Sequence, residues 1–279
     1  MSIFRNFVKS FEKHYKFAQY VGDDTILLCT LDNTFVYLDG RDASLTPSIL
    51  REGNWEPAIG AFISATLSEG DCFVDIGANN GIHSLRAAKA VGEQGLVIAF
   101  EPQERLYTLI RRSIAANVLL NTVHVSRTVI GAEEGSASLG KFEHLTGSAT
   151  LTYNDLIVES EQVPMQPLPT ALTRLAETLR RPITPRLIKI DVEGFEYVVW
   201  DGMREWVSTQ PALTIIMEYS PVSYRDQGRD PLRLLTDIAA SGFTIARLGR
   251  DGRTLAIVSD EWEILAKSQM QFDLILTKT

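Results

Sequence analysis

The residues that point most directly to chemistry are 75–81, with the sequence DIGANNG, directly after the apolar run 72–74. An acid closes this run, and a loop with two glycines and two asparagines follows it. Glycine has no side chain, so the backbone of such a loop can come very close to a ligand. A carboxylate beside the loop disfavours a phosphate-bearing ligand, because like charges repel strongly where the dielectric constant is low. These residue types favour a ligand that is positively charged and carries no phosphate.

Asp75 is one of four acids that stand at the ends of short apolar runs. The runs are expected to be strands, at residues 72–76, 96–100, 187–190 and 213–217. The acids are Asp75, Glu101, Asp191 and Glu218. The carboxyl ends of parallel strands meet at one edge of an open α/β sheet, and ligands bind beyond that edge. The pattern predicts four carboxylates around one cleft, although any single acid of this kind could instead cap the next helix.

S-adenosylmethionine fits these requirements, because it carries an ammonium group, a sulfonium group and a ribose diol but no phosphate. Gly77 and Gly81 would let the backbone approach its methionine end. Glu101, after the second run, would accept hydrogen bonds from both ribose hydroxyls. A dinucleotide would instead require the spacing G-x-G-x-x-G, which residues 77–81 lack. Without Glu101, an ordinary tight turn would be the better explanation of the two glycines.

Helix-like segments lie between the runs and would position the acids at the cleft. Residues 82–91, 103–116 and 195–207 place apolar side chains on one face at helical spacing, and a further helix is expected over 55–68. Apolar strands that alternate with helices predict a parallel sheet covered on both faces. Because crossovers between parallel strands are right-handed, the sheet should be doubly wound. The expected fold class is α/β.

The remaining segments predict an N-terminal extension, an irregular insertion and further strands at the end. Residues 1–18 favour a helix, and two short strands should follow around a polar turn. Residues 131–185 hold five of the eleven prolines and predict a strand pair, a loop and one helix near residues 170–180. Two more strands are expected at 242–249 and 272–279, with a hairpin-like excursion between them.

Length and composition are those of an ordinary globular protein with a sizeable core. The chain has 279 residues, of which 45% are hydrophobic and 22% charged. A net charge of −8 argues against general nucleic-acid binding, and Cys29 and Cys72 show no metal-binding spacing. We see no secretory leader and no apolar run of about 18 residues, so we expect a cytoplasmic protein without a membrane span. A homo-oligomer is left open.

Five stretches resemble the FkbM family of class I S-adenosylmethionine-dependent methyltransferases in order and spacing. They are GNWEP (53–57), DCFVDIGANNGIHSLRAA (71–88), GLVIAFEP (95–102), IAANVLLN (114–121) and LIKIDVEGFEYVVWDG (187–202). The resemblance implies a Rossmann-like sheet of seven strands, the last inserted antiparallel. It also implies methyl transfer to oxygen on a small molecule, a sugar or a natural-product scaffold. We expect an extension over residues 1–54 and a methyltransferase domain over residues 55–279.

The resemblance assigns roles to individual residues. The residues that would hold the methionine portion of S-adenosylmethionine are Asp75, Gly77, Asn79 and Gly81. Glu101 would hold the ribose, and Asp191 would face the reacting centre. His83 stands where many relatives carry an aromatic residue. It could reach the cofactor carboxylate or the acceptor, or it could be a neutral structural histidine.

The acceptor side of the site should contain a base. A hydroxyl acceptor loses a proton when it is methylated, so a carboxylate within hydrogen-bond reach helps. Asp191, Glu193 and Glu218 are the candidates, although Glu193 could instead cap the following helix. Glu196, further along that helix, is expected at the surface or against the sheet. Lys189, inside a strand of buried type, is expected to reach a carboxylate such as Asp75.

Other functions stay open beside an O-methyltransferase. One is a nicotinamide-dependent oxidoreductase on a similar sheet, and another is a non-catalytic binding protein that keeps the fold. A metal site is a separate question. Asp191, Glu193 and Glu218 could hold a divalent ion, since carboxylate oxygens suit Mg²⁺. The ligand arrangement that catechol-type enzymes use is not evident in the sequence, so we expect no metal. The acceptor is expected to be a small molecule or a carbohydrate.

Overall fold

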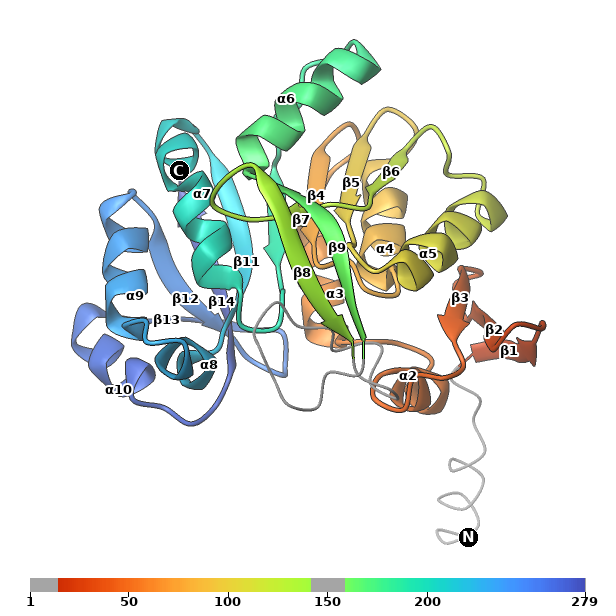
Figure 1. Cartoon of the computed structure of the whole chain (residues 1–279), viewed down its shortest axis with the longest axis horizontal. Coiled ribbons are helices and arrows are strands. Elements are labelled where there is room, and N and C mark those ends of the chain that lie inside the picture. The colour runs from red at the N-terminus through yellow and green to blue at the C-terminus, as the bar shows by residue number, and fades with distance from the viewer. Residues whose placement is uncertain (1–14, 142–158, 279) are drawn as a thin grey trace, which may run out of the picture.

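An eight-stranded sheet forms the centre of the chain, and five neighbouring strands are joined by parallel pairing (Figure 1). The computed structural model describes residues 15–141 and 159–278. The strand order is β13-β12-β14-β11-β10-β4-β5-β6. The parallel strands are β4 (Cys72–Ile76), β5 (Leu96–Phe100), β6 (Val123–Ser126), β10 (Leu187–Ile190) and β11 (Leu213–Tyr219). All four apolar runs that predicted strands are confirmed, and only β6, which has a single buried residue, was not predicted.

Three strands complete the sheet on the β11 side. They are β12 (Thr244–Leu248), β13 (Thr254–Ala256) and β14 (Phe272–Lys278). Strand β14 lies antiparallel between β11 and β12, as the family resemblance implied. Strand β13, which is exposed along its whole length, pairs with β12 at the edge as the expected hairpin-like excursion. The sheet therefore has one short strand more than the seven expected.

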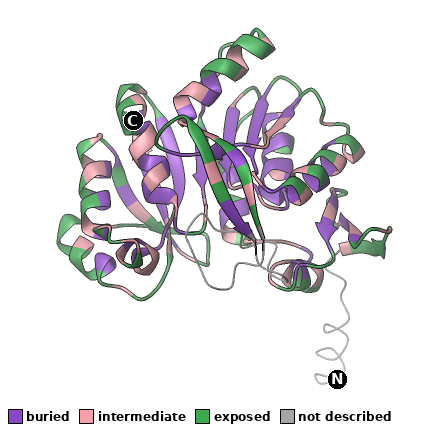
Figure 2. Ribbon diagram, viewed as in Figure 1, coloured by how far each residue is buried: buried purple, intermediate pink, exposed green. Residues whose placement is uncertain are grey.

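Helices cover both faces of this sheet and bury it between two apolar clusters. The helices are α2 (Thr46–Glu52), α3 (Pro57–Thr66), α4 (Ile82–Val91), α5 (Glu104–Ala116), α6 (Leu168–Leu179), α7 (Glu196–Thr209), α8 (Pro221–Asp226), α9 (Pro231–Ala240), the 3₁₀ turn η2 (Ser259–Glu261) and α10 (Trp262–Ala266). Phe73 of β4 packs in the cluster with α3, α4 and α5, whereas Val74 and Ile76 pack with α6, α7 and α9. The sheet is buried throughout its centre (Figure 2) and is doubly wound, as predicted. No helix in the described residues is long and apolar enough to cross a membrane.

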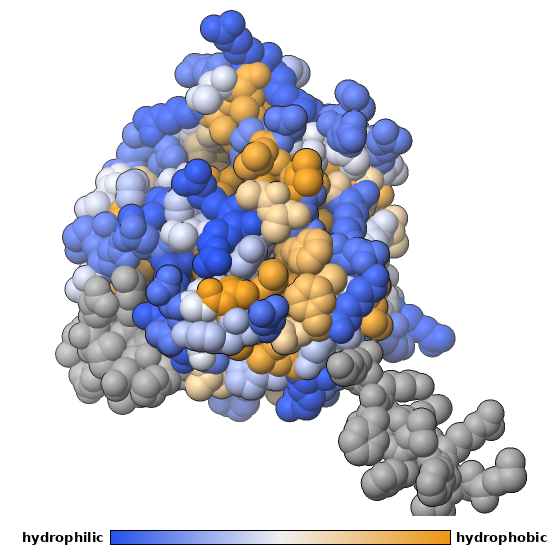
Figure 3. All heavy atoms as spheres, turned by 90° about the vertical axis from the view of Figure 1, so that its right-hand side faces the viewer, coloured by the Kyte–Doolittle hydropathy of each residue, from blue (hydrophilic) through white to orange (hydrophobic). Residues whose placement is uncertain are grey.

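The N-terminal extension is an antiparallel sheet of β1 (Tyr15–Tyr20), β2 (Thr25–Thr30) and β3 (Phe35–Asp39). The two predicted strands are confirmed as β2 and β3. The helix expected over residues 1–18 is wrong for residues 15–18, which pair with β2 as a strand, and residues 1–14 lie outside the described residues. Strand β1 faces outward, and apolar side chains are exposed on this side of the molecule (Figure 3).

Side chains of α5 and its C-cap attach the free edge of β3 to the main domain. The Asn117 amide donates to the Phe35 carbonyl at 2.7 Å and accepts from the Phe35 N–H at 3.0 Å. The Tyr37 N–H donates to the Ser113 hydroxyl at 2.9 Å. These bonds satisfy backbone groups that an edge strand would otherwise leave unpaired.

A third, smaller sheet lies beside the main sheet and contains the predicted strand pair (Figure 1). Its strands are β7 (Val129–Ile130), β8 (Gly135–Lys141) and β9 (Glu159–Gln166). The predicted helix follows as α6, while most of the predicted loop lies outside the described residues. Val129 and Leu139 of this sheet line the cavity described below.

Candidate functional site

A cavity of about 300 Å³ lies beyond the carboxyl ends of β4, β5, β10 and β11. We call it the sheet-edge cavity. Its wall includes residues 77–80 of the glycine loop and the carboxylates Glu56, Glu101, Asp191, Glu193 and Glu218. Three of the four strand-ending acids thus line one space, as the order of the parallel strands predicts. The fourth, Asp75, lies buried behind the wall, and Gly81 is not a wall residue either.

The glycine loop is fixed between β5 and β10. The N–H groups of Gly77 and Ala78 both donate to the Phe100 carbonyl at 3.0 Å. Gly77 has φ +82°, and a Cβ atom there would lie 1.8 Å from the Asp191 carbonyl oxygen. Only glycine fits at this position, because both the backbone angle and the neighbouring strand exclude a side chain. The loop backbone therefore forms part of the cavity wall.

Glu101 is held in place by the loop that it faces. Its two carboxylate oxygens accept hydrogen bonds from the backbone N–H groups of Asn79 and Gln103, both at 2.9 Å. The residue is only 3% exposed, and burial raises the pKa of Glu101 to about 7 although these hydrogen bonds oppose the shift. Each carboxylate oxygen keeps a second lone pair with which it can accept a ligand hydroxyl.

Asp75 is the most buried of the four acids. One carboxylate oxygen accepts from the Ser84 hydroxyl at 2.6 Å, and the other has no hydrogen-bond partner among the described residues. Asp75 is paired in register with Lys189 of the neighbouring strand β10. It therefore lies behind the glycine loop and contributes negative potential there.

Lys189 makes its direct contact with Asp191, not with the expected partner Asp75. The Lys189 ammonium lies 2.7 Å from a carboxylate oxygen of Asp191. The lysine side chain is 3% exposed and that of Asp191 is 27% exposed. Although burial opposes the charge, the carboxylates of Asp191, Asp75 and Glu56 raise the pKa of Lys189 above its ordinary value. Lys189 therefore stays protonated and fixes Asp191 at the cavity wall.

Glu196 shapes the loop between β10 and α7. One of its oxygens accepts from the N–H groups of Val192 at 2.9 Å and Gly194 at 3.1 Å, and the other accepts from the Tyr224 hydroxyl at 3.1 Å. It is fully buried, so the expectation of a surface position was wrong. Burial raises the pKa of Glu196 to about 7. Glu196 thus binds N–H groups of the loop before α7, whereas the helix itself has no side-chain cap of the kind considered for Glu193.

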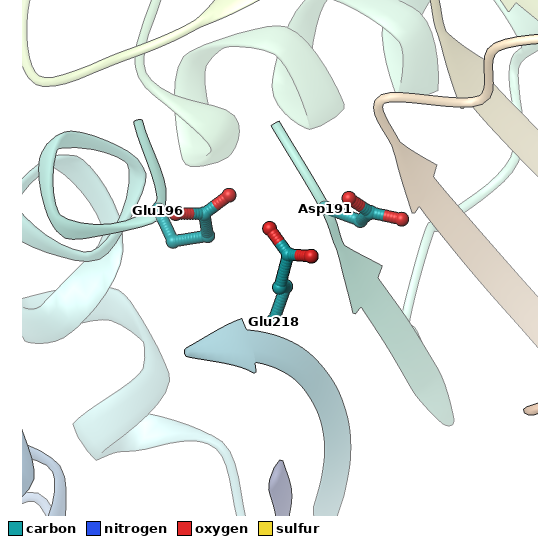
Figure 4. A group of neighbouring side chains, drawn as sticks. All are labelled: Asp191, Glu196 and Glu218. Carbon is teal, nitrogen blue, oxygen red and sulfur yellow. The ribbon is translucent and has the colours of Figure 1, made fainter. Parts of the chain in front are cut away.

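Glu193 and Glu218 face the cavity from two different elements. Glu193 has φ +55° in the loop before α7, and partial burial and the charge of Asp191 raise the pKa of Glu193 to about 7. Glu218, near the end of β11, points into the space between Glu196 and Asp191 (Figure 4). Burial and the charges of Asp191, Glu196 and Glu193 raise the pKa of Glu218 to about 10. At neutral pH this carboxyl group is therefore protonated.

Oxygen atoms of Asp191, Glu196 and Glu218 lie within 4.8 Å of one another. Such a group has the ligand type that Mg²⁺ and Ca²⁺ prefer. However, three protein donors already bind Glu196, and Lys189 already binds Asp191. Protonation of Glu218, which its raised pKa implies at neutral pH, reduces the repulsion among these three acids without an ion.

Glu56 and His83 form a pair at the wall that the sequence analysis did not recognise. His83 Nε2 lies 3.0 Å from a carboxylate oxygen of Glu56. Burial lowers the pKa of His83 to about 3, so the ring is neutral. Burial raises the pKa of Glu56 to about 7. The stretch GNWEP contains Glu56, but nothing in its spacing indicates that residue 56 reaches the strand ends.

The model of the methyltransferase FkbM domain matches residues 75–249, more than half of the chain. The chain belongs to the FkbM methyltransferase family. Methyltransferase sdnD of Sordaria araneosa is 28% identical to this FkbM methyltransferase over 165 residues. The match covers 50% of the chain and 63% of that relative, so it spans less than two thirds of the relative's length.

Solved structures of other methyltransferases are among those to which this chain is similar. Methyltransferase FkbM from Methylobacillus flagellatus has a TM-score of 0.46 and 12% identity, over 82% of this chain and 52% of that one. An O-methyltransferase from Bacillus cereus, in complex with S-adenosylhomocysteine, has a TM-score of 0.47 and 15% identity, over 83% and 84%.

The cofactor of this FkbM methyltransferase is S-adenosylmethionine, and the residues of the sheet-edge cavity fit it. The fit rests on the donor and acceptor groups of the wall. Glu101 offers carboxylate lone pairs for hydroxyl groups, and the side-chain-free Gly77 leaves the loop backbone accessible. Among the wall residues that the structure describes, acids outnumber the single lysine, Lys189, which suits a ligand with ammonium and sulfonium charges.

Proposed function

We propose that this FkbM methyltransferase methylates a hydroxyl oxygen of a small molecule or a carbohydrate. The observation that carries the proposal is the convergence of Asp191, Glu193 and Glu218 beside the glycine loop. Carboxylates next to a methyl-transfer site provide the proton acceptor that a hydroxyl requires. The same acids make the cavity unfavourable for phosphorylated or carboxylated acceptors, because like charges repel.

We assign the cofactor to the side of the cavity formed by the glycine loop and Glu101. In this proposal Glu101 accepts hydrogen bonds from the ribose hydroxyls, and Gly77 and Asn79 contact the methionine portion through their backbone. Asp75 acts from behind the loop through its charge, and Gly81 acts through the turn that starts α4. Bound S-adenosylmethionine supplies a methyl group on a positively charged sulfur, which is the electrophile of the reaction.

The three acids near the acceptor take different roles because their surroundings differ. Asp191, kept in place by Lys189, orients the acceptor hydroxyl opposite the leaving group, and such positioning supplies much of the acceleration. Glu193, whose pKa lies at about 7, is the base that takes the hydroxyl proton near neutral pH. Glu218 is protonated at that pH and donates a hydrogen bond to the acceptor or to its acidic neighbours.

The proposal also concerns the parts of the chain. Residues 55–279 would form the methyltransferase domain, and residues 1–54 an extension that packs on it. The acceptor would enter where β7 and β8 border the cavity, since Val129 of β7 and Leu139 of β8 are wall residues.

The attacked atom can be determined by isotope transfer. The protein is incubated with trideuteromethyl-labelled S-adenosylmethionine and a metabolite extract, and labelled products are isolated by mass spectrometry. NMR of the product should show the label on an ether oxygen. A label on nitrogen or carbon would contradict O-methylation, and no labelled product from any extract would favour the non-catalytic alternative.

Asp191→Asn tests the role given to the orienting acid. With the acceptor found in this way, we expect turnover to fall by about 10²–10⁴-fold, the usual contribution of a positioned polar group. Affinity for S-adenosylhomocysteine, measured by calorimetry, should change by less than about threefold. Equal losses in turnover and affinity would instead indicate that Asp191 binds the cofactor.

A further inference from the structure

We propose that Glu56 is a further cofactor-binding residue, whose carboxylate accepts a hydrogen bond from the α-ammonium group of S-adenosylmethionine. The inference rests on the proposed function, because it takes the ribose to lie beside Glu101. The observation that carries it is a carboxylate held in a left-handed backbone conformation at the wall of the same cavity.

The backbone of Glu56 is in a conformation that glutamate rarely adopts. Its φ is +42° and its ψ is +69°, directly before the first residue of α3. A left-handed conformation costs free energy in any residue with a Cβ atom, and such strain gathers at functional sites. Asn79 and Glu193, which also line the cavity, share the positive φ. Glycine would remove the strain, so position 56 requires the glutamate side chain for another reason.

The contacts of Glu56 fix its carboxylate without neutralising it. His83 Nε2 lies 3.0 Å away, and the Glu56 side chain, which belongs to the cavity wall, is 31% exposed. Because the His83 ring is neutral, this hydrogen bond orients the carboxylate and adds no positive charge. His83 belongs to the first turn of α4, which directly follows the glycine loop. Glu56 is therefore anchored to the helix end of the loop that is assigned to the methionine portion.

No cation among the described residues is dedicated to Glu56. Lys189, the only lysine among the described wall residues, forms its direct ion pair with Asp191. Burial, together with the charge of Asp191, raises the pKa of Glu56 to about 7 although Lys189 opposes the shift. A bound ammonium group would supply the missing positive charge. The carboxylate would then be fully ionised in the complex.

Glu56 lies on the side of the cavity away from Glu101. Its carboxylate interacts electrostatically with Lys189 of β10, with Asp191 directly after that strand, and with Asp273 of β14. Glu101 follows β5, and β4 separates β5 from β10 in the sheet order. A nucleoside whose ribose lies at Glu101 therefore extends its amino acid portion across β4 toward Glu56.

Two ligands that differ only in the amino acid portion separate the roles. Calorimetry with S-adenosylhomocysteine and with 5′-methylthioadenosine is performed on the full chain and on Glu56→Gln. We expect the affinity for S-adenosylhomocysteine to fall by about 10–100-fold, as for the loss of a charged hydrogen bond. The affinity for 5′-methylthioadenosine, which has no ammonium group, should stay within about twofold. An unchanged S-adenosylhomocysteine affinity, or an equal loss for both ligands, would overturn the inference.

Glu56→Gly guards against a purely structural effect, because glycine relieves the backbone strain. This variant should melt at the wild-type temperature or above it and still lose affinity for S-adenosylhomocysteine alone. Arg180→Gly is the matched control, since Arg180 has φ +51° at the end of α6, outside the cavity wall. It should leave both affinities unchanged.

If the wild-type chain binds neither ligand, the proposed function itself fails. If it binds both and Glu56→Gln binds them equally well, only the role of Glu56 fails.

Discussion

The carboxylates of the sheet-edge cavity are chemically alike, yet their surroundings give them different charges. Asp191 is paired with the buried ammonium of Lys189. Glu101 is almost fully buried, but two backbone N–H groups stabilise its ionised form. Glu218 has three acids around it and, among the residues that the structure describes, a single hydrogen bond, from the Ser220 hydroxyl at 3.3 Å. Different surroundings therefore suit these carboxyl groups to the different roles proposed for them.

Replacing Glu101 tests the ribose assignment. Glu101→Ala removes the carboxylate that would accept the ribose hydroxyls, so binding of S-adenosylhomocysteine should weaken by roughly 1–3 kcal/mol. Calorimetry gives this value directly. Glu101→Gln keeps the shape and removes the charge, and it serves as the milder control. Unchanged affinity in both variants would remove Glu101 from the cofactor site.

The raised pKa of Glu218 predicts a stability that depends on pH. In the folded chain this pKa is about 10, compared with an ordinary value of 4.5. The folded state then binds a proton that the unfolded state has lost, so this group makes stability fall as pH rises from about 4.5 toward about 10. Glu218→Gln imitates the protonated acid and removes this loss. We expect its gain over wild type to be larger at pH 8 than at pH 5, by roughly 1–4 kcal/mol.

Urea unfolding at the two pH values measures the effect of Glu218→Gln. Glu93→Gln, at an exposed position before β5, is the matched control and should show no such difference between the two pH values. A gain that is the same at pH 5 and pH 8 would mean that Glu218 ionises at its ordinary pKa in the folded chain.

At the level of elements, two short loops convert strand ends into a binding site. The glycine loop after β4 is bound to β5 through the Phe100 carbonyl and lies against the Asp191 carbonyl of β10. The loop after β10 is held by Glu196, which is itself hydrogen-bonded to Tyr224 of α8. Neither loop depends only on its own sequence, because each is fixed by a neighbouring strand or helix.

Gly77→Ala should damage the glycine loop more than backbone strain alone would. The new Cβ would lie 1.8 Å from the Asp191 carbonyl oxygen, so β4 and β10 would have to separate. We expect a loss of about 2–5 kcal/mol in the free energy of unfolding, from strain and overpacking together. Binding of S-adenosylhomocysteine should weaken with it.

The matched control for Gly77→Ala is Gly70→Ala. Gly70 has a similar φ of +88°, and a Cβ atom there would meet nothing within 4 Å. Gly70→Ala should lower the free energy of unfolding by only about 1–2 kcal/mol, the cost of the left-handed conformation. Chemical denaturation measures the free energy of unfolding of both variants. Equal losses would show that contact with β10 does not require the glycine.

At the scale of the whole molecule, the sheet-edge cavity lies where several elements of the chain meet. The main sheet brings the strand ends, α4 brings His83, and the segment before α3 brings Glu56. The small sheet of β7, β8 and β9 borders the same cavity. A ligand that fills the cavity therefore contacts several elements at once, and its binding should stabilise the whole chain.

The melting temperature of the whole chain distinguishes S-adenosylhomocysteine from NAD as a ligand. S-adenosylhomocysteine at about 100 times its Kd should stabilise the chain by about 2.7 kcal/mol. This corresponds to a rise in Tm of about 5–10 °C for a chain of this size. NAD at the same concentration should leave Tm unchanged, because its pyrophosphate would face the carboxylates of the wall. A larger shift with NAD would contradict the assigned site.

The sequence by itself determined which residues stand at the strand ends. Continuous apolar runs identify buried parallel strands, and the direction of the chain fixes which end each acid occupies. This is why Glu101, Asp191 and Glu218 were predicted to share one cleft, and why the alternation of strands and helices indicated a doubly wound sheet. Strand β6, with one buried residue, and the strand at residues 15–18 lack such a run and were not predicted.

Only the tertiary structure decided which other groups reach the cavity and which charges they carry. Glu56 comes from before α3, and the buried position of Glu196 depends on Tyr224 in a later helix. Lys189 binds Asp191 because alternate residues of a strand project from the same face, whereas Asp75 lies on the neighbouring strand. Burial and neighbouring charges set each pKa, and both depend on contacts between residues that are distant in sequence.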